Sequence, residues 1–307
     1  MRIAIIGAGA MGSLVASYLA PTNEVWMLDS WRDHIDAITN NGLMRTIDDT
    51  TVVTTPHATT DVASIPTCDV AIVLVKYHQT AWAGQQARHV ISHSGVCVTL
   101  QNGVGNGDIL ATVIPPERVC VGVTSLGATL VGPGLVRHAG MGATVFANAQ
   151  NTATMNAVAA AFQTSGLPAS TQRDVASIVW GKLIVNVGIN ALTGILRVPN
   201  GVLTRNLDAL QILTEAVTEA VTVAHAEGIT LPYHDPLAHV LQVATATAAN
   251  RSSTLSDVLR GSPSEIPTIN GAIVRAAARH GIPVPVNTLL CSLMASIDAT
   301  HHEQIHP

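Results

Sequence analysis

The chain has 307 residues, of which 48% are hydrophobic and 11% are charged, and its formal net charge is -5. This length allows two ordinary domains with substantial cores. The absence of a basic run excludes a surface for nucleic acid. No apolar run reaches membrane-spanning length without a charge or a Gly, Pro or Asn break, so we expect no membrane partner.

The N-terminus and the cysteines predict a cytoplasmic location. No positively charged leader precedes the first apolar run. The four cysteines stand far apart in apolar contexts and have neither a dense disulfide pattern nor metal-ligand spacing. They are Cys68, Cys97, Cys120 and Cys291. We expect free buried thiols and no metal ion.

The first half alternates short apolar runs with helical periodicity, and the runs predict buried strands. The predicted strands are 2–6, 24–28, 69–75, 95–100 and 119–124. A Gly-rich stretch follows from Gly127 to Gly142. Strands that alternate with helices are typical of an α/β fold with a doubly wound parallel sheet.

A glycine motif joins the first predicted strand to the first predicted helix. Gly7 permits the tight turn, Gly9 lets a pyrophosphate approach the backbone, and Gly12 lets helix and strand pack closely. The helix N-terminus then offers free N–H groups to the phosphates. This context predicts a Rossmann-type dinucleotide site. Its candidate cofactor-binding residues are Gly7, Ala8, Gly9, Ala10, Met11 and Gly12.

Asp29 ends the second predicted strand, where an acid hydrogen-bonds the adenosine ribose of a dinucleotide. A carboxylate at this point repels the 2′-phosphate of NADP, so the sequence favours NAD(H) over NADP(H). Arg32 is a candidate phosphate partner and keeps NADP open. An alternative role for Asp29, compatible with the first, is to cap a helix predicted over 30–38.

Lys76 and Asn102 follow two inner strands of the predicted sheet. Ligands bind at this edge of an open α/β sheet, so both residues are candidates for the cofactor site. The alternative for Lys76 is that it is only the first solvated residue after a buried strand.

The second half is mostly helical. The predicted helices are 151–166, 174–196, 207–227, 236–250, 253–259, 266–280 and 288–299, and 168–173 is a last strand or a linker. We expect a dinucleotide-binding domain over 1–172 and a helical substrate-binding domain over 173–307. The apolar surplus of the second half favours a homodimer. The His301-His302-x-x-x-His306 pattern is interpreted as a frayed tail rather than a metal site.

Lys182, Asn186 and Asn190 are spaced by four residues in the apolar segment 177–196. On a helix this spacing puts all three on one face. Burial of an ammonium and two amides without partners costs several kcal/mol, so the face is predicted to line a polar ligand site. The alternative is a solvated stripe. Glu265, from spacing alone, is a first-turn acid that answers a helix dipole.

These residues together resemble the ketopantoate reductase family (2-dehydropantoate 2-reductases), over nearly the whole chain. The most specific motif pair is Trp180-x-Lys182-x-x-x-Asn186-x-x-x-Asn190 with Glu265-Ile-x-x-Ile-Asn270-Gly271. The other matching segments are the glycine motif, Val75-Lys76 with Gln79, Gln101-Asn102-Gly103, Pro199-Asn200-Gly201 and Gly281-Ile-Pro-Val-Pro285-x-Asn287.

The resemblance implies reduction of a 2-keto acid to the D-2-hydroxy acid by hydride transfer from a nicotinamide cofactor. It implies that Lys182 hydrogen-bonds the keto oxygen and supplies its proton, and that Glu265 orients the lysine and a substrate hydroxyl. Lys76 and Asn102 match positions that contact cofactor and substrate. The implied substrate-binding residues are Asn186, Asn190, Asn200 and Ser253.

The chain departs from the family pattern at three positions. Ser30 stands where many members have an Arg for the NADP phosphate, Ala191 replaces a Pro, and Pro267 replaces an Asp. The segment 28–38 looks more like the NAD-dependent D-2-hydroxy acid dehydrogenases of the same family, which are the alternative function. The β-hydroxy acid and 6-phosphogluconate dehydrogenases are a further enzyme class, and a non-catalytic NAD(P) sensor is an alternative of another class.

Overall fold

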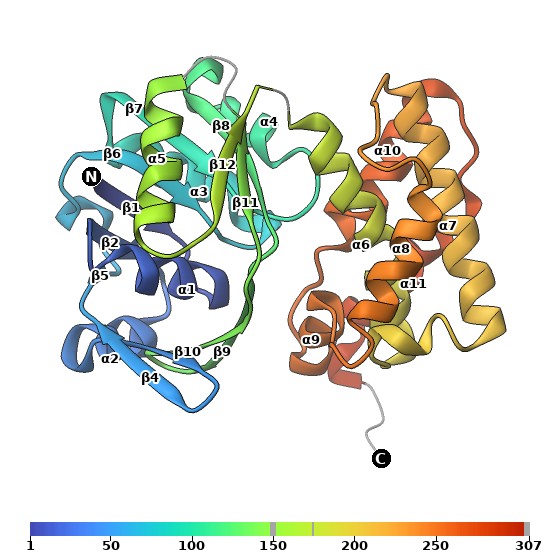
Figure 1. The fold of residues 1–307 in the computed structure, drawn as a ribbon, viewed down its shortest axis with the longest axis horizontal. Coiled ribbons are helices and arrows are strands. Elements are labelled where there is room, and N and C mark those ends of the chain that lie inside the picture. The colour runs from blue at the N-terminus through green and yellow to red at the C-terminus, as the bar shows by residue number, and fades with distance from the viewer. Residues whose placement is uncertain (148–151, 174, 304–307) are drawn as a thin grey trace. The chain divides into compact units, whose positions relative to one another are not determined.

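A computed structural model describes residues 1–147, 152–173 and 175–303. The chain divides into two compact units (Figure 1). The first unit comprises Met1–Gln101 and Asn106–Val175, and the second comprises Asn102–Gly105 and Ala176–Pro307. Residues 102–105 are therefore grouped with the helical part of the chain, although they follow a strand of the first unit.

The main sheet of the first unit has the strand order β12-β11-β8-β7-β6-β1-β2-β5 within the described residues. Its strands are β1 (Arg2–Ile6), β2 (Glu24–Leu28), β5 (His57–Thr59), β6 (Cys68–Val73), β7 (Ile91–Thr99), β8 (Val119–Thr124), β11 (Thr144–Ala147) and β12 (Ala169–Gln172). Neighbours pair in parallel except β8 and β11, which are antiparallel. The predicted α/β class is confirmed, and the segment left open as strand or linker contains β12.

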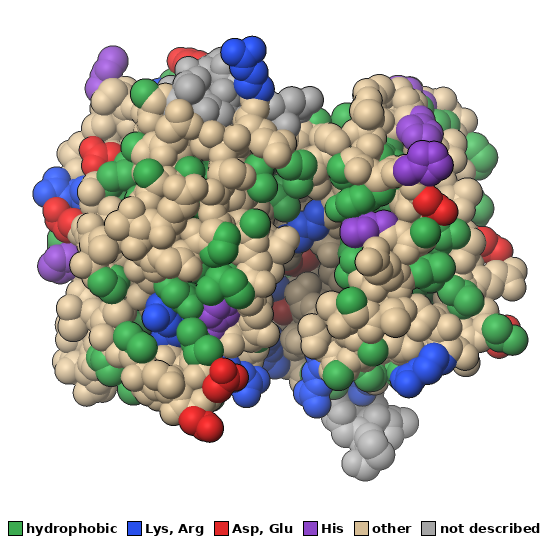
Figure 2. Space-filling model, viewed as in Figure 1, with side chains coloured by type: hydrophobic (Ala, Val, Ile, Leu, Met, Phe, Trp, Pro, Cys, Tyr) green, Lys and Arg blue, Asp and Glu red, His purple; other side chains and the backbone are tan. Residues whose placement is uncertain are grey.

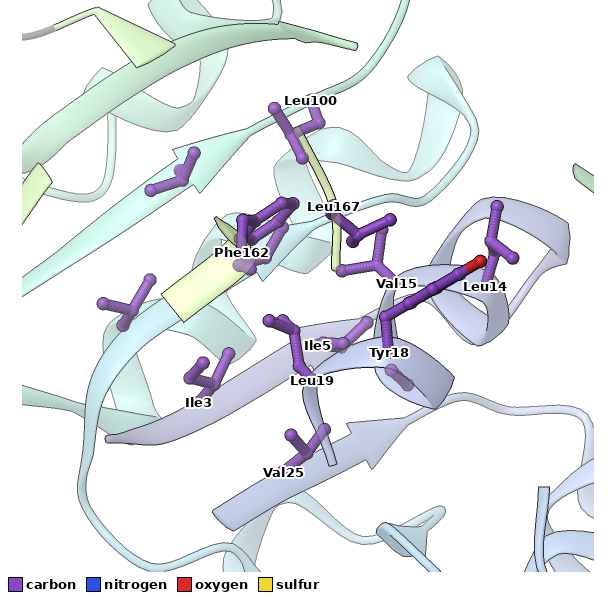
Figure 3. Packing of buried hydrophobic residues seen from close by; sticks show 14 of the residues in the cluster. Ile3, Ile5, Leu14, Val15, Tyr18, Leu19, Val25, Leu100, Phe162 and Leu167 are labelled. Carbon is purple, nitrogen blue, oxygen red and sulfur yellow. The ribbon is translucent and has the colours of Figure 1, made fainter. Parts of the chain in front are cut away.

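Helices cover both faces of the main sheet. They are α1 (Ala10–Leu19), α2 (Arg32–Asn41), α3 (Thr80–Val90), α4 (Asn106–Ala111) and α5 (Thr152–Thr164), with short 3-10 turns η1 (Val62–Ser64), η2 (Tyr77–Gln79) and η3 (Pro116–Arg118). Side chains alternate along β1, as a strand requires. Ile3 and Ile5 join a core with α1 and α5 (Figure 3), whereas Ala4 and Ile6 join a core with α3 and α4. β1 is therefore buried on both faces.

A four-stranded sheet, which the sequence pattern did not predict, packs against α1. Its order is β4-β3-β10-β9, with β3 (Leu43–Ile47), β4 (Thr50–Thr54), β9 (Gly127–Gly132) and β10 (Leu135–Gly140). The Gly-rich stretch thus forms two antiparallel strands. Most of their side chains are only partly buried, so they lack the apolar run that marks an inner strand.

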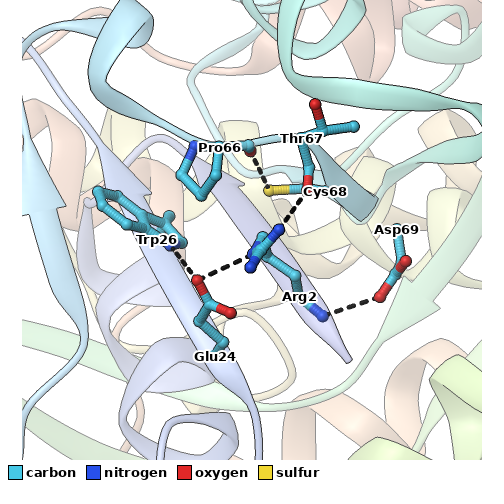
Figure 4. Close-up of polar contacts among 7 residues, drawn as sticks. All are labelled: Arg2, Glu24, Trp26, Pro66, Thr67, Cys68 and Asp69. Carbon is cyan, nitrogen blue, oxygen red and sulfur yellow. Dashed lines mark hydrogen bonds and ion pairs between the residues drawn. The ribbon is translucent and has the colours of Figure 1, made fainter.

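Arg2 holds the starts of three strands together (Figure 4). Its backbone N–H donates to Asp69 Oδ2 at 2.9 Å, and its Nη1 donates to the Thr67 carbonyl at 3.0 Å. The guanidinium also pairs with Glu24 Oε1 at 2.8 Å, and this oxygen accepts the Trp26 indole N–H at 3.0 Å. Exposed pairs of this kind stabilise little, so the cluster serves mainly to align β1, β2 and β6.

The second unit is helical. Its helices are α6 (Ala176–Leu196), α7 (Leu207–Ala226), α8 (Pro236–Ala246), α9 (Ser253–Arg260), α10 (Asn270–His280) and α11 (Pro285–Ala299), with η4 (Asn200–Val202), η5 (Ile266–Thr268) and η6 (His301–Glu303). α6 packs against α7, α8, α9 and α11. By length and composition it is the one described helix that could cross a membrane, but 67% of its apolar window is buried in the structure. Figure 2 shows that hydrophobic side chains are also exposed at scattered points on the visible face.

Several predicted helix limits differ from the observed ones. The segment 266–280 is broken at Ile269, whose φ of -104° and ψ of -94° separate η5 from α10. Glu265 precedes η5, and its side chain caps no helix there. α11 begins earlier than predicted, at Pro285. The predicted helix starts at 151 and 174, and the histidine pattern ending at 306, lie partly outside the described residues.

Candidate active site

The glycine loop between β1 and α1 leaves room beside its middle glycine. A Cβ on Gly7, where φ is +102°, would lie 2.8 Å from the Val75 nitrogen, and a Cβ on Gly12 would lie 1.9 Å from the Gly7 oxygen. A Cβ on Gly9 would meet nothing within 4 Å. Gly9 is also the N-cap residue of α1 and offers no side-chain cap. The free N–H groups of the first turn and the open space fit a pyrophosphate group.

Ala8, Ala10 and Met11 complete the loop. Ala8 is buried, whereas Ala10 and Met11 are partly exposed in the first turn of α1. The loop therefore presents backbone rather than polar side chains to its surroundings.

Asp29 follows β2 and lies against the glycine loop. Its Oδ2 accepts the Ala8 N–H at 2.7 Å, and its Oδ1 accepts the Trp31 N–H at 3.0 Å. The N-cap residue of α2 is Trp31 rather than Asp29. The alternative role of Asp29 as a helix cap is therefore wrong, because its contact with Trp31 is a local turn ahead of the helix. Asp29 remains a candidate for the ribose-binding acid that follows the second strand in this fold class.

Lys182, Asn102 and Glu265 form a hydrogen-bonded chain in the second unit. Lys182 Nζ donates to Asn102 Oδ1 at 2.8 Å, and Asn102 Nδ2 donates to Glu265 Oε2 at 3.2 Å. Glu265 is 6% exposed. Burial lowers the pKa of Lys182 to about 8, and the negative charge of Glu265 opposes this shift. The arrangement places an ammonium of lowered pKa beside an acceptor amide and a buried acid.

The position of Asn102 depends on the residue after it. Gly103 has a φ of +87°, and a Cβ there would lie 2.3 Å from the Thr268 oxygen. That oxygen also accepts the Val104 N–H at 3.2 Å. Thr268 in turn bonds the Glu265 carbonyl through its hydroxyl at 3.0 Å. The segment 102–105 is thus held on η5, beside Glu265.

The remaining predicted substrate residues lie on α6 and nearby turns. Asn186 is partly buried one turn after Lys182. Asn190 is 6% exposed, and its Nδ2 donates to Ser253 Oγ at 3.4 Å. Ser253 is the exposed first residue of α9. These contacts extend the polar face of α6 beyond Lys182.

Asn200 is 8% exposed, and its Nδ2 donates to Thr247 Oγ1 at 2.9 Å. Among the described residues its buried Oδ1 has no hydrogen-bond partner. Such a buried acceptor without a partner is uncommon in folded proteins. Lys76, by contrast, belongs to the first unit, where it precedes η2 after β6.

Sequence reasoning missed the residues that position this site. Thr247 and Thr268 lie near the ends of the predicted helices 236–250 and 266–280, where a single threonine gives no signal of its own. Asn270 and Asn287 were noted only as parts of motifs, and both are fully buried. Asn270 Nδ2 donates to the Val187 carbonyl of α6 at 3.3 Å and to Asn287 Oδ1 at 2.9 Å. These two asparagines therefore fix the helix that carries Lys182.

Comparisons with known proteins show the family of the chain. Residues 3–151 match the family model described as "Ketopantoate reductase PanE/ApbA", and residues 174–298 match its C-terminal counterpart. The chain is similar to the 2-dehydropantoate 2-reductase of Halobacterium salinarum, with 38% identity over 96% of this chain and 98% of that protein.

Two solved structures are similar over the whole chain. A PanE/ApbA family ketopantoate reductase from Ralstonia eutropha has a TM-score of 0.91 at 32% identity, covering 98% of this chain and 100% of its own. A ternary structure of D-mandelate dehydrogenase with NADH and anilino(oxo)acetate has a TM-score of 0.91 at 28% identity, with the same coverage.

The Rossmann-type unit with its glycine loop, joined in one chain to a helical unit with the lysine–amide–carboxylate chain, defines an NAD(P)-dependent oxidoreductase. The similarity to 2-dehydropantoate 2-reductases extends over almost the full length of both proteins. The chain belongs to the ketopantoate reductase family.

Substitutions in the glycine loop should affect protein stability and NADH affinity separately. Gly9→Ala adds a methyl group into open space at a φ of -63°, so the free energy of unfolding should change by less than about 0.5 kcal/mol. The methyl group would occupy the space expected for the pyrophosphate, so the affinity for NADH should fall about tenfold or more. Gly12→Ala forces a backbone clash and should destabilise by about 3 kcal/mol. Urea unfolding and NADH titration measure both effects. Equal NADH affinity in Gly9→Ala and the unmodified protein would contradict the pyrophosphate site.

Proposed function

We propose that the protein reduces a 2-keto acid, 2-dehydropantoate or a close relative, to the D-2-hydroxy acid with NADH, and that Lys182 is the general acid. The observation that carries this proposal is the chain from Lys182 through Asn102 to Glu265. The first unit is assigned the dinucleotide and the second unit the keto acid.

Lys182 stabilises the keto oxygen and then protonates it. When bound, the reduced nicotinamide supplies a hydride to the keto carbon. Negative charge then develops on the oxygen, and a preplaced ammonium stabilises that charge. A pKa of about 8 allows Lys182 to be largely protonated at neutral pH and still give up its proton. Asn102 accepts one ammonium hydrogen and so fixes the direction of the others.

The polar groups beyond Lys182 are assigned to the rest of the substrate. Asn186, Asn190 and Ser253 offer amide and hydroxyl donors, which suit a carboxylate. Asn200 offers a buried acceptor, which suits a substrate hydroxyl. Glu265, buried and bonded to Asn102, is assigned to orient both Lys182 and a hydroxyl of the substrate.

NADH is the proposed cofactor because of Asp29. Its carboxylate is held by the Ala8 N–H, directly beside the glycine loop, and it would repel the 2′-phosphate of NADPH. No arginine follows it immediately, since the next residue is Ser30. The similar D-mandelate dehydrogenase structure contains NADH, which supports the assignment.

A second candidate function is an NAD-dependent dehydrogenase of branched or aromatic D-2-hydroxy acids. The whole-chain likeness to D-mandelate dehydrogenase favours it. It uses the same site chemistry in the opposite direction, and the side chain of the substrate decides between the two functions.

The experiment that tests the function is oxidation of NADH and NADPH in parallel with a panel of 2-keto acids. Fast turnover of 2-dehydropantoate supports the proposed reductase. Faster turnover of bulkier keto acids with NADH, up to phenylglyoxylate, supports the second candidate. Nucleotide binding without turnover of any keto acid contradicts both and supports a cofactor sensor.

Asp29→Ala should weaken NADH more than NADPH. Loss of hydrogen bonds to a charged acceptor costs about 1.5–3 kcal/mol, so the Kd for NADH should rise about 10- to 100-fold. The Kd for NADPH should change less, because the repulsion of its phosphate is removed as well. Fluorescence titration of both nucleotides measures this, with Asp33→Ala in the exposed first turn of α2 as the matched control. An unchanged Kd for NADH would refute the ribose role.

The pH dependence of reduction should follow Lys182. The proton donor is lost above its pKa, so kcat/KM should fall as pH rises through about 8. Glu265→Gln removes the charge that raises the lysine pKa and should move this fall to lower pH. Lys182→Ala should lower kcat about 100- to 10,000-fold while NADH affinity is retained. A profile that stays flat through pH 8, or full turnover in Lys182→Ala, would rule out the lysine as the acid.

A further inference from the structure

His34 is a fully buried side chain of α2 that the proposed reaction does not use. It lies in the first unit, and its ring stacks on Trp31 with centroids 5.1 Å apart. Burial lowers the pKa of His34, against a smaller opposing effect of the Asp29 charge. A buried imidazole needs partners for both ring nitrogens, and these partners show what it holds in place.

The partners of the ring fix which nitrogen carries the proton. The Gly134 N–H, in the turn between β9 and β10, donates to His34 Nδ1 at 3.0 Å. A backbone N–H can only donate, so Nδ1 is the acceptor and Nε2 carries the hydrogen of the neutral ring. His34 Nε2 lies 3.0 Å from Ser13 Oγ and therefore donates to it.

The same direction continues into the glycine loop. Ser13 Oγ donates to the Ala8 carbonyl at 2.8 Å. On the other side of the same residue, the Ala8 N–H donates to Asp29 Oδ2 at 2.7 Å. Three hydrogen bonds thus run in one direction from Gly134 to the Ala8 carbonyl, and the N–H of the same residue makes a separate bond to the Asp29 carboxylate. Each donor in the relay from Gly134 to Ala8 has one acceptor, and these three aligned bonds strengthen one another.

We propose that His34 is a positioning residue for the dinucleotide: through Ser13 it fixes the backbone that receives the pyrophosphate and the carboxylate that receives the ribose. The inference rests on the proposed function, since both groups are assigned to NADH. His34 itself takes no part in hydride or proton transfer. Loss of the relay lets the loop and Asp29 move. The loop then loses more conformational entropy when NADH binds, and the affinity for NADH falls.

Two substitutions of His34 test its two ring nitrogens separately. His34→Asn puts an amide oxygen near the place of Nδ1, so it keeps the acceptor for Gly134 and loses the donor to Ser13. His34→Gln puts an amide nitrogen near the place of Nε2, so it keeps the donor to Ser13 and loses the acceptor for Gly134. If His34 acts through the glycine loop, only the Asn variant should lose NADH affinity.

The measurement is fluorescence titration of NADH into the full-length protein, with steady-state kinetics at saturating NADH. We expect the Kd for NADH to rise about tenfold in His34→Asn and less than about threefold in His34→Gln. The kcat and the KM for the keto acid should change less than about twofold in both. Ser13→Ala should reproduce His34→Asn, and the double variant should add nothing further, because both break one relay.

The outcomes distinguish the inference from the proposed function. The Ser13→Ala variant carries the test if a His34 variant does not fold, because it removes one oxygen atom and leaves the ring. Weaker NADH binding in His34→Gln than in His34→Asn would mean that the ring only anchors the β9–β10 turn, which overturns the inference. Unchanged affinity in Ser13→Ala overturns it too. If the unmodified protein binds no NADH, the proposed function fails and the inference with it.

Discussion

The central constraint on the second unit is the free-energy cost of burying the Lys182 ammonium, which its partners must offset. α6 is apolar along most of its length, and Lys182 is its only charged residue. An ammonium without partners in such a setting costs several kcal/mol. The Asn102 amide and the Glu265 carboxylate reduce this cost without neutralising the lysine directly, because the amide lies between the two charges. The Asn102 amide is therefore a hydrogen-bond partner of both charged groups.

The first unit meets a different requirement, which is to leave backbone N–H groups open in an otherwise tightly packed loop. Gly7 and Gly12 are glycines because a Cβ would strike the backbone, whereas Gly9 is open to its surroundings. The loop is then stiffened by bonds to its backbone at Ala8 rather than by its own side chains. In both units the candidate binding groups are held in place by hydrogen bonds to other polar groups.

Much of the fold followed from local patterns in the sequence. Strands buried on both faces, such as β1, are short apolar runs, and the central helix α6 is a long apolar segment, so their positions were predicted closely. The four-stranded sheet was missed because its half-exposed strands depend on pairing between residues far apart, such as Leu135 with Met44. The break at Ile269 was missed for a related reason, since nothing local distinguishes it from a continuous helix.

Parts of the candidate site also depended on contacts that spacing does not encode. The helical spacing of Lys182, Asn186 and Asn190 predicted a polar face, but Glu265 was assigned to the site only through a family resemblance. Its link through Asn102 requires the close approach of Gly103 to Thr268, between segments widely separated in sequence. The histidine relay behind the glycine loop likewise joins three elements, and neither His34 nor Ser13 belongs to a recognisable motif.

The grouping of residues 102–105 with the helical unit means that the boundary between the units is not a single point in the sequence. The chain changes unit after Gln101, after Gly105 and after Val175. A helical fragment that starts at Ala176 therefore lacks the amide that accepts the Lys182 hydrogen bond. A fragment that ends at Val175 carries that amide without its lysine. Neither fragment contains the whole chain of hydrogen bonds from Lys182 through Asn102 to Glu265. A recombinant of two relatives that exchanges the segment after Val175 must therefore keep Asn102 in the segment before it.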